Sequence, residues 1–311
     1  MNPKGGTEIQ KEQLVEQLDK HELEGINLIT SICHPNLLKQ DEINIIWQQL
    51  SYDQPNVQLM ADRRFVDQIP YFVYNSHWCF NQFREKFKIP EYKSFVIKNA
   101  VHAFTDVKPY QKGNKIKLIY TSTPWRGLSI LLLALQYLNK QRDDFECDIY
   151  SSTSIYGKAF EEQTKDQFEP LFDKCRNTKN VNYQGYATND EIRQALTKAD
   201  ILAYPSIFEE TSCIAVIEAM MARCKVVTTN YGALTETGTD FADMIEFEPN
   251  FQMLAQRFAV KLNAVMNQYQ KGELEDDLEL QVQYYNRHYS WQTRINEWRN
   301  FLAYAKKRST N

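Results

Sequence analysis

Two carboxylates, Glu210 and Glu218, stand eight positions apart in the sequence. The apolar run before Pro205 predicts a short buried strand, and the apolar spacing that follows predicts a helix. Free backbone N–H groups and the positive end of the helix dipole would bind a diphosphate. Glu218, about two turns into the helix, would accept hydrogen bonds from ribose hydroxyls, and Glu210 would lie nearer the other end of the ligand. The spacing therefore fits a sugar-nucleotide site, and it fits equally well a capped amphipathic helix with ordinary surface glutamates.

The backbone groups that would meet the diphosphate belong to four consecutive residues, Thr211, Ser212, Cys213 and Ile214. Cys213 is also the only cysteine that we consider as a nucleophile, because it stands at a predicted helix N-terminus. No histidine or other base stands beside it in the sequence. The six cysteines are scattered without a C-x-x-C pair, which indicates reduced thiols rather than disulfides or metal ligands.

Composition excludes several classes of protein. The formal net charge is -4, from 36 basic and 40 acidic residues that are dispersed along the chain, so we expect no nucleic-acid partner. No apolar run approaches the ~20 residues that cross a bilayer, and the N-terminus is polar, so we expect a cytoplasmic protein. No aspartate-rich cluster stands out, and we expect neither a metal nor a cofactor.

The segment from Glu210 to Met220 resembles the E-x7-E signature of retaining GT-B glycosyltransferases, glycosyltransferase family 4. The resemblance continues into the glycine-containing loop at Gly232, and residues 181–248 follow the order of the family. One departure is that Ser212 and Cys213 stand where many members have a Phe-Gly pair. The resemblance implies two doubly wound Rossmann-like domains that face a donor cleft, retention at the anomeric carbon, and a last helix that crosses back to the N-terminal domain.

The order of predicted elements agrees with an α/β fold, because short β-rich runs alternate with helical patterns. The expected strands are 26–30, 43–47, 71–74, 95–97, 115–120, 147–150, 181–185, 201–204, 225–229 and 244–247. Expected helices include 129–138 and 191–197, the latter after a capping box that starts at Thr188. We expect a reduced N-terminal acceptor domain over 1–110, a donor domain over 111–289, a linker at 105–114, and the crossing helix at about 290–311.

Two further segments could meet the diphosphate. Gly5 and Gly6 open a predicted helix with Leu14, Val15 and Leu18 facing inward, and glycine lets a ligand approach the backbone closely. Within the resemblance this is the family's glycine-rich loop near the N-terminus, and the usual strand before it is expected to be missing. A flexible chain end is the alternative interpretation.

The other segment follows the strand at 115–120. Arg126 stands where the family carries a basic residue before glycine, and its guanidinium can grip phosphate oxygens in a bidentate manner. Ser122 would replace, by its hydroxyl, a contact of the family's earlier Gly-Arg pair, which is absent. Where members often have a histidine that faces the sugar, this chain has Gln48 and Gln49.

The C-terminal segment predicts a helix with one apolar face, formed by Trp291, Ile295, Trp298 and Leu302. Packing against protein is the first interpretation of this stripe. The alternative is that the aromatic face and the basic residues at 306–308 rest on an anionic membrane surface.

The function that we expect is a metal-independent, retaining transfer of a sugar from a UDP- or GDP-linked donor to a glycan, lipid or other hydroxyl acceptor. Glu210 and Arg126 would be the catalytic residues, and stabilising the departing diphosphate would supply the rate enhancement. A sugar-nucleotide 2-epimerase and a noncatalytic sugar-nucleotide-binding subunit remain as alternatives.

Overall fold

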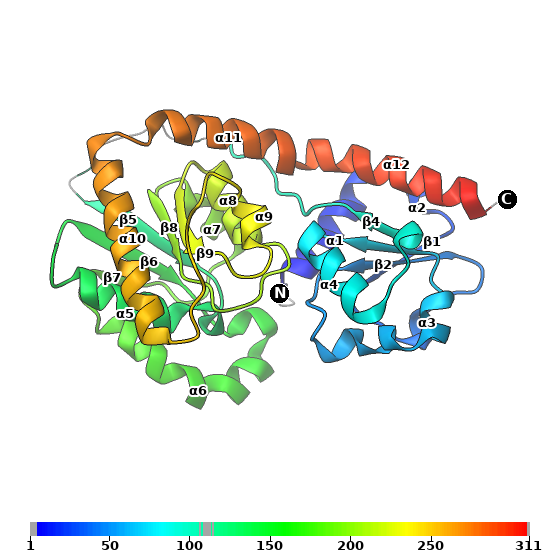
Figure 1. The fold of residues 1–311 in the computed structure, drawn as a ribbon, viewed down its shortest axis with the longest axis horizontal. Coiled ribbons are helices and arrows are strands. Elements are labelled where there is room, and N and C mark those ends of the chain that lie inside the picture. The colour runs from blue at the N-terminus through cyan, green and yellow to red at the C-terminus, as the bar shows by residue number, and fades with distance from the viewer. Residues whose placement is uncertain (1–4, 106, 108–112, 114, 310–311) are drawn as a thin grey trace. The chain divides into compact units, whose positions relative to one another are not determined.

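The computed structural model describes residues 5–105, 107, 113 and 115–309, and these form two compact units (Figure 1). Of the described residues, the four-stranded unit holds Gly6–His102, Glu210–Ile214 and 288–309. The six-stranded unit holds Ala103–Glu209 and Ala215–Arg287, together with Gly5. The linker expected at 105–114 lies mostly outside the described residues.

The four-stranded unit is built on one parallel sheet with the order β1-β2-β3-β4. Its strands are β1 (Ile26–Thr30), β2 (Ile43–Gln48), β3 (Tyr71–Tyr74) and β4 (Ser94–Val96). Its helices are α1 (Gly6–Gln17), α2 (Lys20–Leu23), η1 (Pro35–Leu37), η2 (Pro55–Ala61), α3 (Arg63–Asp67), α4 (His77–Phe87), η3 (Glu91–Lys93) and α12 (Trp291–Ser309). Because β2 and β3 are central and covered on both faces, they are almost wholly buried.

Both faces of this sheet carry a hydrophobic core. On one face, Trp47 of β2 packs against α1 and α12, and its ring meets that of Trp298 edge-on with centroids 4.8 Å apart. On the other face, Ile46 and Phe72 pack with η2, α3 and α4. The apolar stripe predicted for the last helix is therefore buried in this core, and Trp291, Ile295, Trp298 and Leu302 all belong to it.

The six-stranded unit contains a parallel sheet with the order β10-β9-β8-β5-β6-β7. Its strands are β5 (Ile116–Thr121), β6 (Phe145–Tyr150), β7 (Val181–Tyr183), β8 (Ile201–Tyr204), β9 (Lys225–Thr229) and β10 (Asp243–Ile245). Its helices are η4 (Pro124–Arg126), α5 (Leu128–Leu138), η5 (Ser154–Tyr156), α6 (Lys158–Arg176), α7 (Asn189–Leu196), α8 (Ile214–Met221), α9 (Leu234–Gly238), α10 (Phe251–Lys271) and α11 (Glu275–Tyr289).

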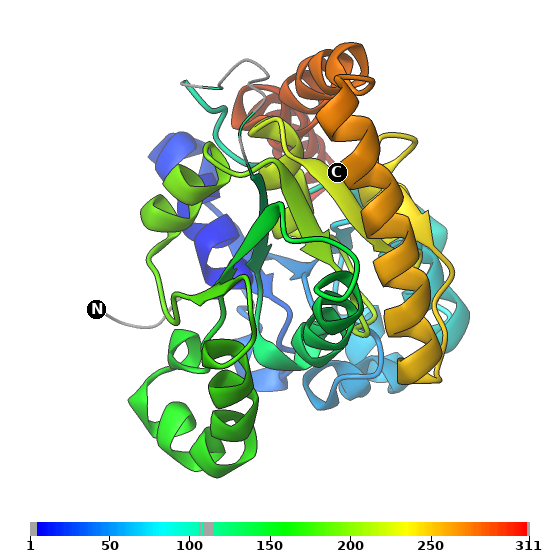
Figure 2. The same cartoon turned by 90° about the vertical axis from the view of Figure 1, so that its left-hand side faces the viewer.

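The chain reverses its direction of travel across this sheet. It moves outward from β5 through β6 to β7, then returns to β8 beside β5 and continues to β10. Right-handed crossovers place helices on opposite faces for the two directions of travel. In Figure 2, α5 and the long α10 lie together on one face and α7 lies on the other. The helix α5 is apolar nearly all round because it is buried between the sheet and α10.

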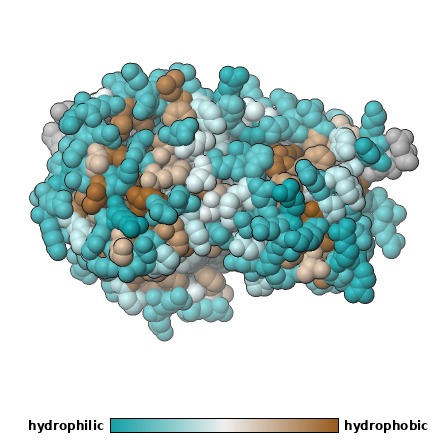
Figure 3. Space-filling model, in the orientation of Figure 1, coloured by the Kyte–Doolittle hydropathy of each residue, from teal (hydrophilic) through white to brown (hydrophobic). Residues whose placement is uncertain are grey.

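Most sequence-based expectations for the elements are confirmed. All ten expected strands are present, and Thr188 caps α7 in a capping box with Glu191. The inward placement of Val15 is wrong, since 44% of this residue is exposed while Leu14 is fully buried. On the face drawn in Figure 3, hydrophilic residues predominate and apolar residues show as small separate groups. Among the described residues, no helix is long and apolar enough to span a membrane.

Candidate functional site

The candidate site begins where the sheet order of the six-stranded unit reverses. Strands β5 and β8 are neighbours in the sheet, and Leu118 pairs with Ile201. In the sequence, 82 residues, which include strands β6 and β7, lie between these two positions. In doubly wound sheets, ligands bind outside the carboxyl ends of the strands at this switch point. The loops that follow β5 and β8 are therefore the places where donor-binding side chains are expected.

These two loops are in direct contact. Gly127 has φ +124°, and a Cβ built on it would lie 2.1 Å from the carbonyl oxygen of Pro205. Only glycine permits both this backbone conformation and this approach. The carbonyl of Arg126 also accepts a hydrogen bond from the N–H of Ile207 at 3.4 Å. The basic residue that precedes Gly127 is thus held beside the segment that leads to Glu210.

Arg126 ends η4, and its side chain reaches across to the second loop. The guanidinium carbon lies 4.1 Å from the centroid of the Phe208 ring, which is a cation–π contact. Stacking on an aromatic face restricts the guanidinium plane, so the donors of Arg126 are presented in a preferred direction. Ser122 follows β5 in the same loop and is partly exposed.

The loop after β8 is ordered by its own polar groups. The hydroxyl of Ser206 donates to the carbonyl of Phe208 at 3.0 Å and accepts from its N–H at 3.2 Å. The carbonyl of Ser206 accepts from the hydroxyl of Thr229, at the end of β9, at 2.8 Å. Because these bonds are buried or partly buried, they stabilise one loop conformation.

Glu218 is the fifth residue of α8, which begins at Ile214, so it lies little more than one turn into the helix rather than about two. Its buried carboxylate accepts a hydrogen bond from Nη1 of Arg193 at 3.0 Å. Burial raises the pKa of the Glu218 carboxyl, and the charge and hydrogen bond of Arg193 act in the opposite direction. Glu218 is therefore not the ordinary surface glutamate of the alternative interpretation.

The side chain of Arg193, which lies on α7, has further contacts besides its hydrogen bond to Glu218. Its Nη2 donates to the carbonyl of Ala103 at 3.3 Å, and its guanidinium carbon lies 3.9 Å from the centroid of the Phe104 ring. The first residues of the six-stranded unit thus order the arginine that pairs with Glu218. No local pattern in the sequence indicated this role, because the two partners are 25 positions apart.

The other predicted residues of the segment belong to the four-stranded unit. Glu210 and Cys213 are buried there, and Thr211 bonds to that unit through its side chain. A Cβ on Gly6, the first residue of α1, would lie 3.1 Å from Cδ1 of Ile214, so the structure brings these two predicted residues together. Burial does not favour the interpretation of Cys213 as a nucleophile.

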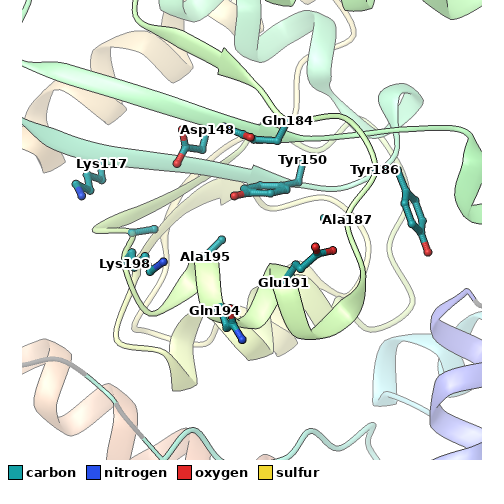
Figure 4. A pocket seen from close by; sticks show the side chains of 11 residues that line it. Lys117, Asp148, Tyr150, Gln184, Tyr186, Ala187, Glu191, Gln194, Ala195 and Lys198 are labelled. Carbon is teal, nitrogen blue, oxygen red and sulfur yellow. The ribbon is translucent and has the colours of Figure 1, made fainter.

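A pocket of about 440 Å³ lies elsewhere in the six-stranded unit (Figure 4). It is bounded by the sheet on one side and α7 on the other, with Lys117, Asp148, Tyr150, Glu191 and Lys198 among its lining residues. None of the predicted site residues lines it. Within the described residues, no group of three or more His, Cys, Asp or Glu side chains could hold a metal ion.

The sequence pattern of the family described as Glycosyl transferases group 1 matches residues 104–281, more than half of the chain. This chain therefore belongs to that family. The matched residues include both loops of the switch point and the segment with the two carboxylates. Among curated proteins, no sequence matches this chain.

Solved structures share the fold. A glycosyltransferase from Rickettsia africae ESF-5 has a TM-score of 0.68 and 18% identity, over 99% of this chain and 84% of its own. Anabaena HepE, solved with UDP and glucose, has a TM-score of 0.63 and 14% identity, over 84% and 72%. The pneumococcal O-GlcNAc transferase GtfA, solved with UDP and GlcNAc, has a TM-score of 0.65 and 13% identity, over 97% and 60%. This likeness shows that the two parallel α/β sheets form the GT-B fold.

Sequence reasoning missed several residues that the structure places around the predicted ones. Arg193 and Phe208 are the partners of Glu218 and Arg126. Asn75, which bonds to Thr211, was also missed, although a signal existed, because this amide directly follows the buried strand β3. Polar residues immediately after buried parallel strands mark the edge at which ligands bind.

Proposed function

We propose that this protein is a retaining glycosyltransferase that moves a sugar from a nucleoside diphosphate sugar to a hydroxyl acceptor. The observation that carries the proposal is the contact of the two loops at the switch point. It holds Arg126 against Phe208, directly before the segment that carries Glu210 and Glu218. A cation and a helix N-terminus each suit a diphosphate, and a carboxylate within such a helix suits a ribose.

Each predicted residue has a role in this proposal. Arg126, with the hydroxyl of Ser122, contacts the diphosphate, as do the backbone N–H groups of Thr211, Ser212, Cys213 and Ile214. Glu218 accepts hydrogen bonds from the ribose, and Glu210 contacts the transferred sugar. Gly5 and Gly6 leave the backbone open to the donor. Stabilisation of the departing diphosphate lowers the barrier, because its negative charge grows as the sugar leaves.

The donor is a UDP- or GDP-linked sugar. UDP has specific support, because HepE and GtfA were both solved in complex with UDP. The acceptor is a glycan, a lipid-linked sugar or another hydroxyl compound. Retention is proposed from the resemblance of the E-x7-E segment, and the anomeric configuration of the product, measured by proton coupling constants, tests it directly.

Any contact with a membrane is expected to be electrostatic and not to involve the aromatic stripe of α12. That stripe lies in the core of the four-stranded unit, whereas Lys307 and Arg308 are exposed at the end of the helix. Binding should then increase with anionic lipid and decrease with salt. Sedimentation with vesicles of phosphatidylglycerol and phosphatidylcholine, compared with phosphatidylcholine alone, measures this.

The function is tested in two steps. A thermal-shift panel of UDP, GDP, ADP and their sugar conjugates identifies the donor, since a ligand at one hundred times its Kd stabilises the folded state by about 2.7 kcal/mol. Release of nucleotide from that donor is then measured with and without a panel of sugar and lipid-linked acceptors.

Each outcome of the release assay points to one class. Acceptor-dependent release supports the glycosyltransferase. Conversion of the donor sugar without an acceptor indicates the 2-epimerase, and tight binding without turnover indicates a noncatalytic subunit. Absence of any nucleotide binding contradicts the proposal.

A further inference from the structure

Neutral polar residues stand at the carboxyl end of each strand in the four-stranded sheet. They are Ser31 after β1, Gln49 after β2, Asn75 after β3 and Asn99 after β4, and all four are buried. The carboxyl ends of parallel strands share one edge of the sheet, so these side chains meet there. None of the four carries a charge.

Hydrogen bonds join these residues into one network. The backbone N–H of Gln49 donates to the hydroxyl of Ser31 at 3.1 Å. Its side-chain Nε2 donates to Oδ1 of Asn99 at 2.8 Å, and its Oε1 accepts from Nδ2 of Asn75 at 3.1 Å. The Gln49 side-chain amide thus donates to one neighbour and accepts from the other, so both of its polar groups are used.

The network ends on Thr211, the residue that follows Glu210. Nδ2 of Asn75 donates to the Thr211 hydroxyl at 3.1 Å, and that hydroxyl donates to the backbone carbonyl of Gln49 at 3.0 Å. Both hydrogens of the Asn75 amide are used, one on Gln49 and one on Thr211. Thr211 is itself buried, with 7% of the residue exposed.

Resting on the proposed function, we propose that Thr211 is a positioning residue for Glu210. The network holds the Thr211 side chain at the edge of the four-stranded sheet, and consecutive Cα atoms are about 3.8 Å apart, so the backbone of the buried Glu210 is held with it. A carboxylate that contacts the transferred sugar has to keep its geometry within a fraction of an ångström. The side chain at position 211 therefore acts on catalysis without contacting the substrate.

The central test is Thr211→Val, which keeps the shape of the side chain and removes its hydroxyl. We expect kcat to fall roughly 10- to 100-fold, the loss that a misplaced catalytic group causes. Nucleoside diphosphate affinity should fall by less than kcat, because Arg126 and Glu218 are ordered by other contacts and only the backbone N–H groups of this loop are affected. Thr211→Ser keeps the hydroxyl and should retain most of the activity. Thr178→Val is the matched control, because it removes a hydroxyl that donates to the Lys174 carbonyl at the end of α6.

Asn75→Ala removes both donors on the other side of the contact. This variant should also have a lower kcat. In the double variant Thr211→Val/Asn75→Ala, kcat should be no lower than in the more impaired single variant, because both changes break one network. Losses that multiply would show that the two residues act independently and would contradict the proposal.

Amide hydrogen exchange gives a readout that does not depend on activity. Residues 210–214 should exchange faster in Thr211→Val than in the wild type, and at the wild-type rate in Thr211→Ser and Thr178→Val. Unchanged exchange in Thr211→Val, unchanged kcat, or equal impairment of the valine and serine variants would overturn the proposal. If the wild type neither binds nor turns over any donor, the proposed function fails, while the exchange experiment still decides whether Thr211 holds this loop.

Discussion

Nη1 of Arg193 on α7 lies 3.0 Å from Oε1 of Glu218 on α8, and both side chains are largely buried. A buried carboxylate needs a charged partner or several hydrogen bonds to stay ionised. Arg193 supplies the charged partner and a hydrogen bond, and its own orientation is set by the ring of Phe104. The carboxylate proposed to receive the ribose is therefore prepared before the nucleotide arrives.

Glu218→Gln should weaken nucleotide binding by about 1.5 to 3 kcal/mol, the contribution of a hydrogen bond to a charged group. The fold should survive, because glutamine has nearly the same shape and can still accept from Arg193. Calorimetric titration with the identified nucleoside diphosphate measures the change. Unchanged affinity in a folded variant would remove Glu218 from the ribose site.

Arg193→Met should affect both stability and the pH dependence of binding. Loss of the cation leaves the carboxyl buried without its partner, which costs about 3 kcal/mol or more, and the pKa of Glu218 should rise further above its ordinary value. Because only the ionised carboxylate binds the ribose well, nucleotide affinity of this variant should increase as the pH is raised. Its stability should fall over the same range, since the folded state binds the proton more tightly than the unfolded state. Arg193→Lys, which keeps the charge, should show a weaker form of both effects, and the same pH profile in wild type and Arg193→Met would contradict the pairing.

Glu210→Gln should reduce the transfer rate and leave nucleoside diphosphate affinity nearly intact, because the nucleotide does not reach this side chain in the proposed arrangement. Steady-state kinetics beside calorimetry separate the two quantities. Glu209→Gln is the matched control, since it changes the neighbouring carboxylate. An equal loss of rate and of diphosphate affinity would argue against placing Glu210 at the sugar.

Arg126→Ala should lower kcat as well as donor affinity, because a contact with charge that grows during the reaction is stronger in the transition state than in the ground state. Arg126→Lys should recover part of the rate, since lysine restores the charge but not the planar, bidentate contact. Phe208→Leu removes the ring beneath the guanidinium and separates catalysis from packing. If Arg126 acted only by packing on that ring, Phe208→Leu would cause the same loss as Arg126→Ala.

Gly127→Ala should destabilise the six-stranded unit by more than the ~1 to 3 kcal/mol that an unfavourable backbone conformation costs, because its Cβ would also overlap the carbonyl oxygen of Pro205. Gly25→Ala is the matched control, since Gly25 also has a positive φ but no atom lies within 4 Å of the added Cβ. Thermal or urea unfolding measures both variants. Equal losses would show that the close approach of the two loops contributes nothing.

Transfer activity should persist in excess EDTA, because the guanidinium of Arg126 and the helix N-terminus can balance the charge of the departing diphosphate. The assay compares initial rates before and after addition of the chelator. Loss of activity that Mg²⁺ or Mn²⁺ restores would count against this mechanism.

Many elements of this fold could be predicted from the sequence, because the patterns that indicate them involve residues close together in the chain. The apolar run 201–204 and the run 225–229, which is rich in β-branched residues, are buried strands, and the expected bounds of both agree with the structure to the residue. The capping box at Thr188 was equally clear, since its two partners are three positions apart. The exposure of Val15 could not be predicted in this way. Val15 and the buried Leu14 are consecutive residues of α1, and only the packing of this helix selects which of them is buried.

The sequence by itself determined the alternation of strands and helices, the segment with Glu210 and Glu218, and the loop with Arg126. Only the tertiary structure decided which residues hold these groups in place. The pairing of Arg193 with Glu218, the stacking of Arg126 on Phe208, and the bonds from Asn75 and Gln49 to Thr211 each join distant parts of the chain. Such contacts leave no periodicity in the sequence, because they depend on which strand ends and helix faces the sheet order brings together.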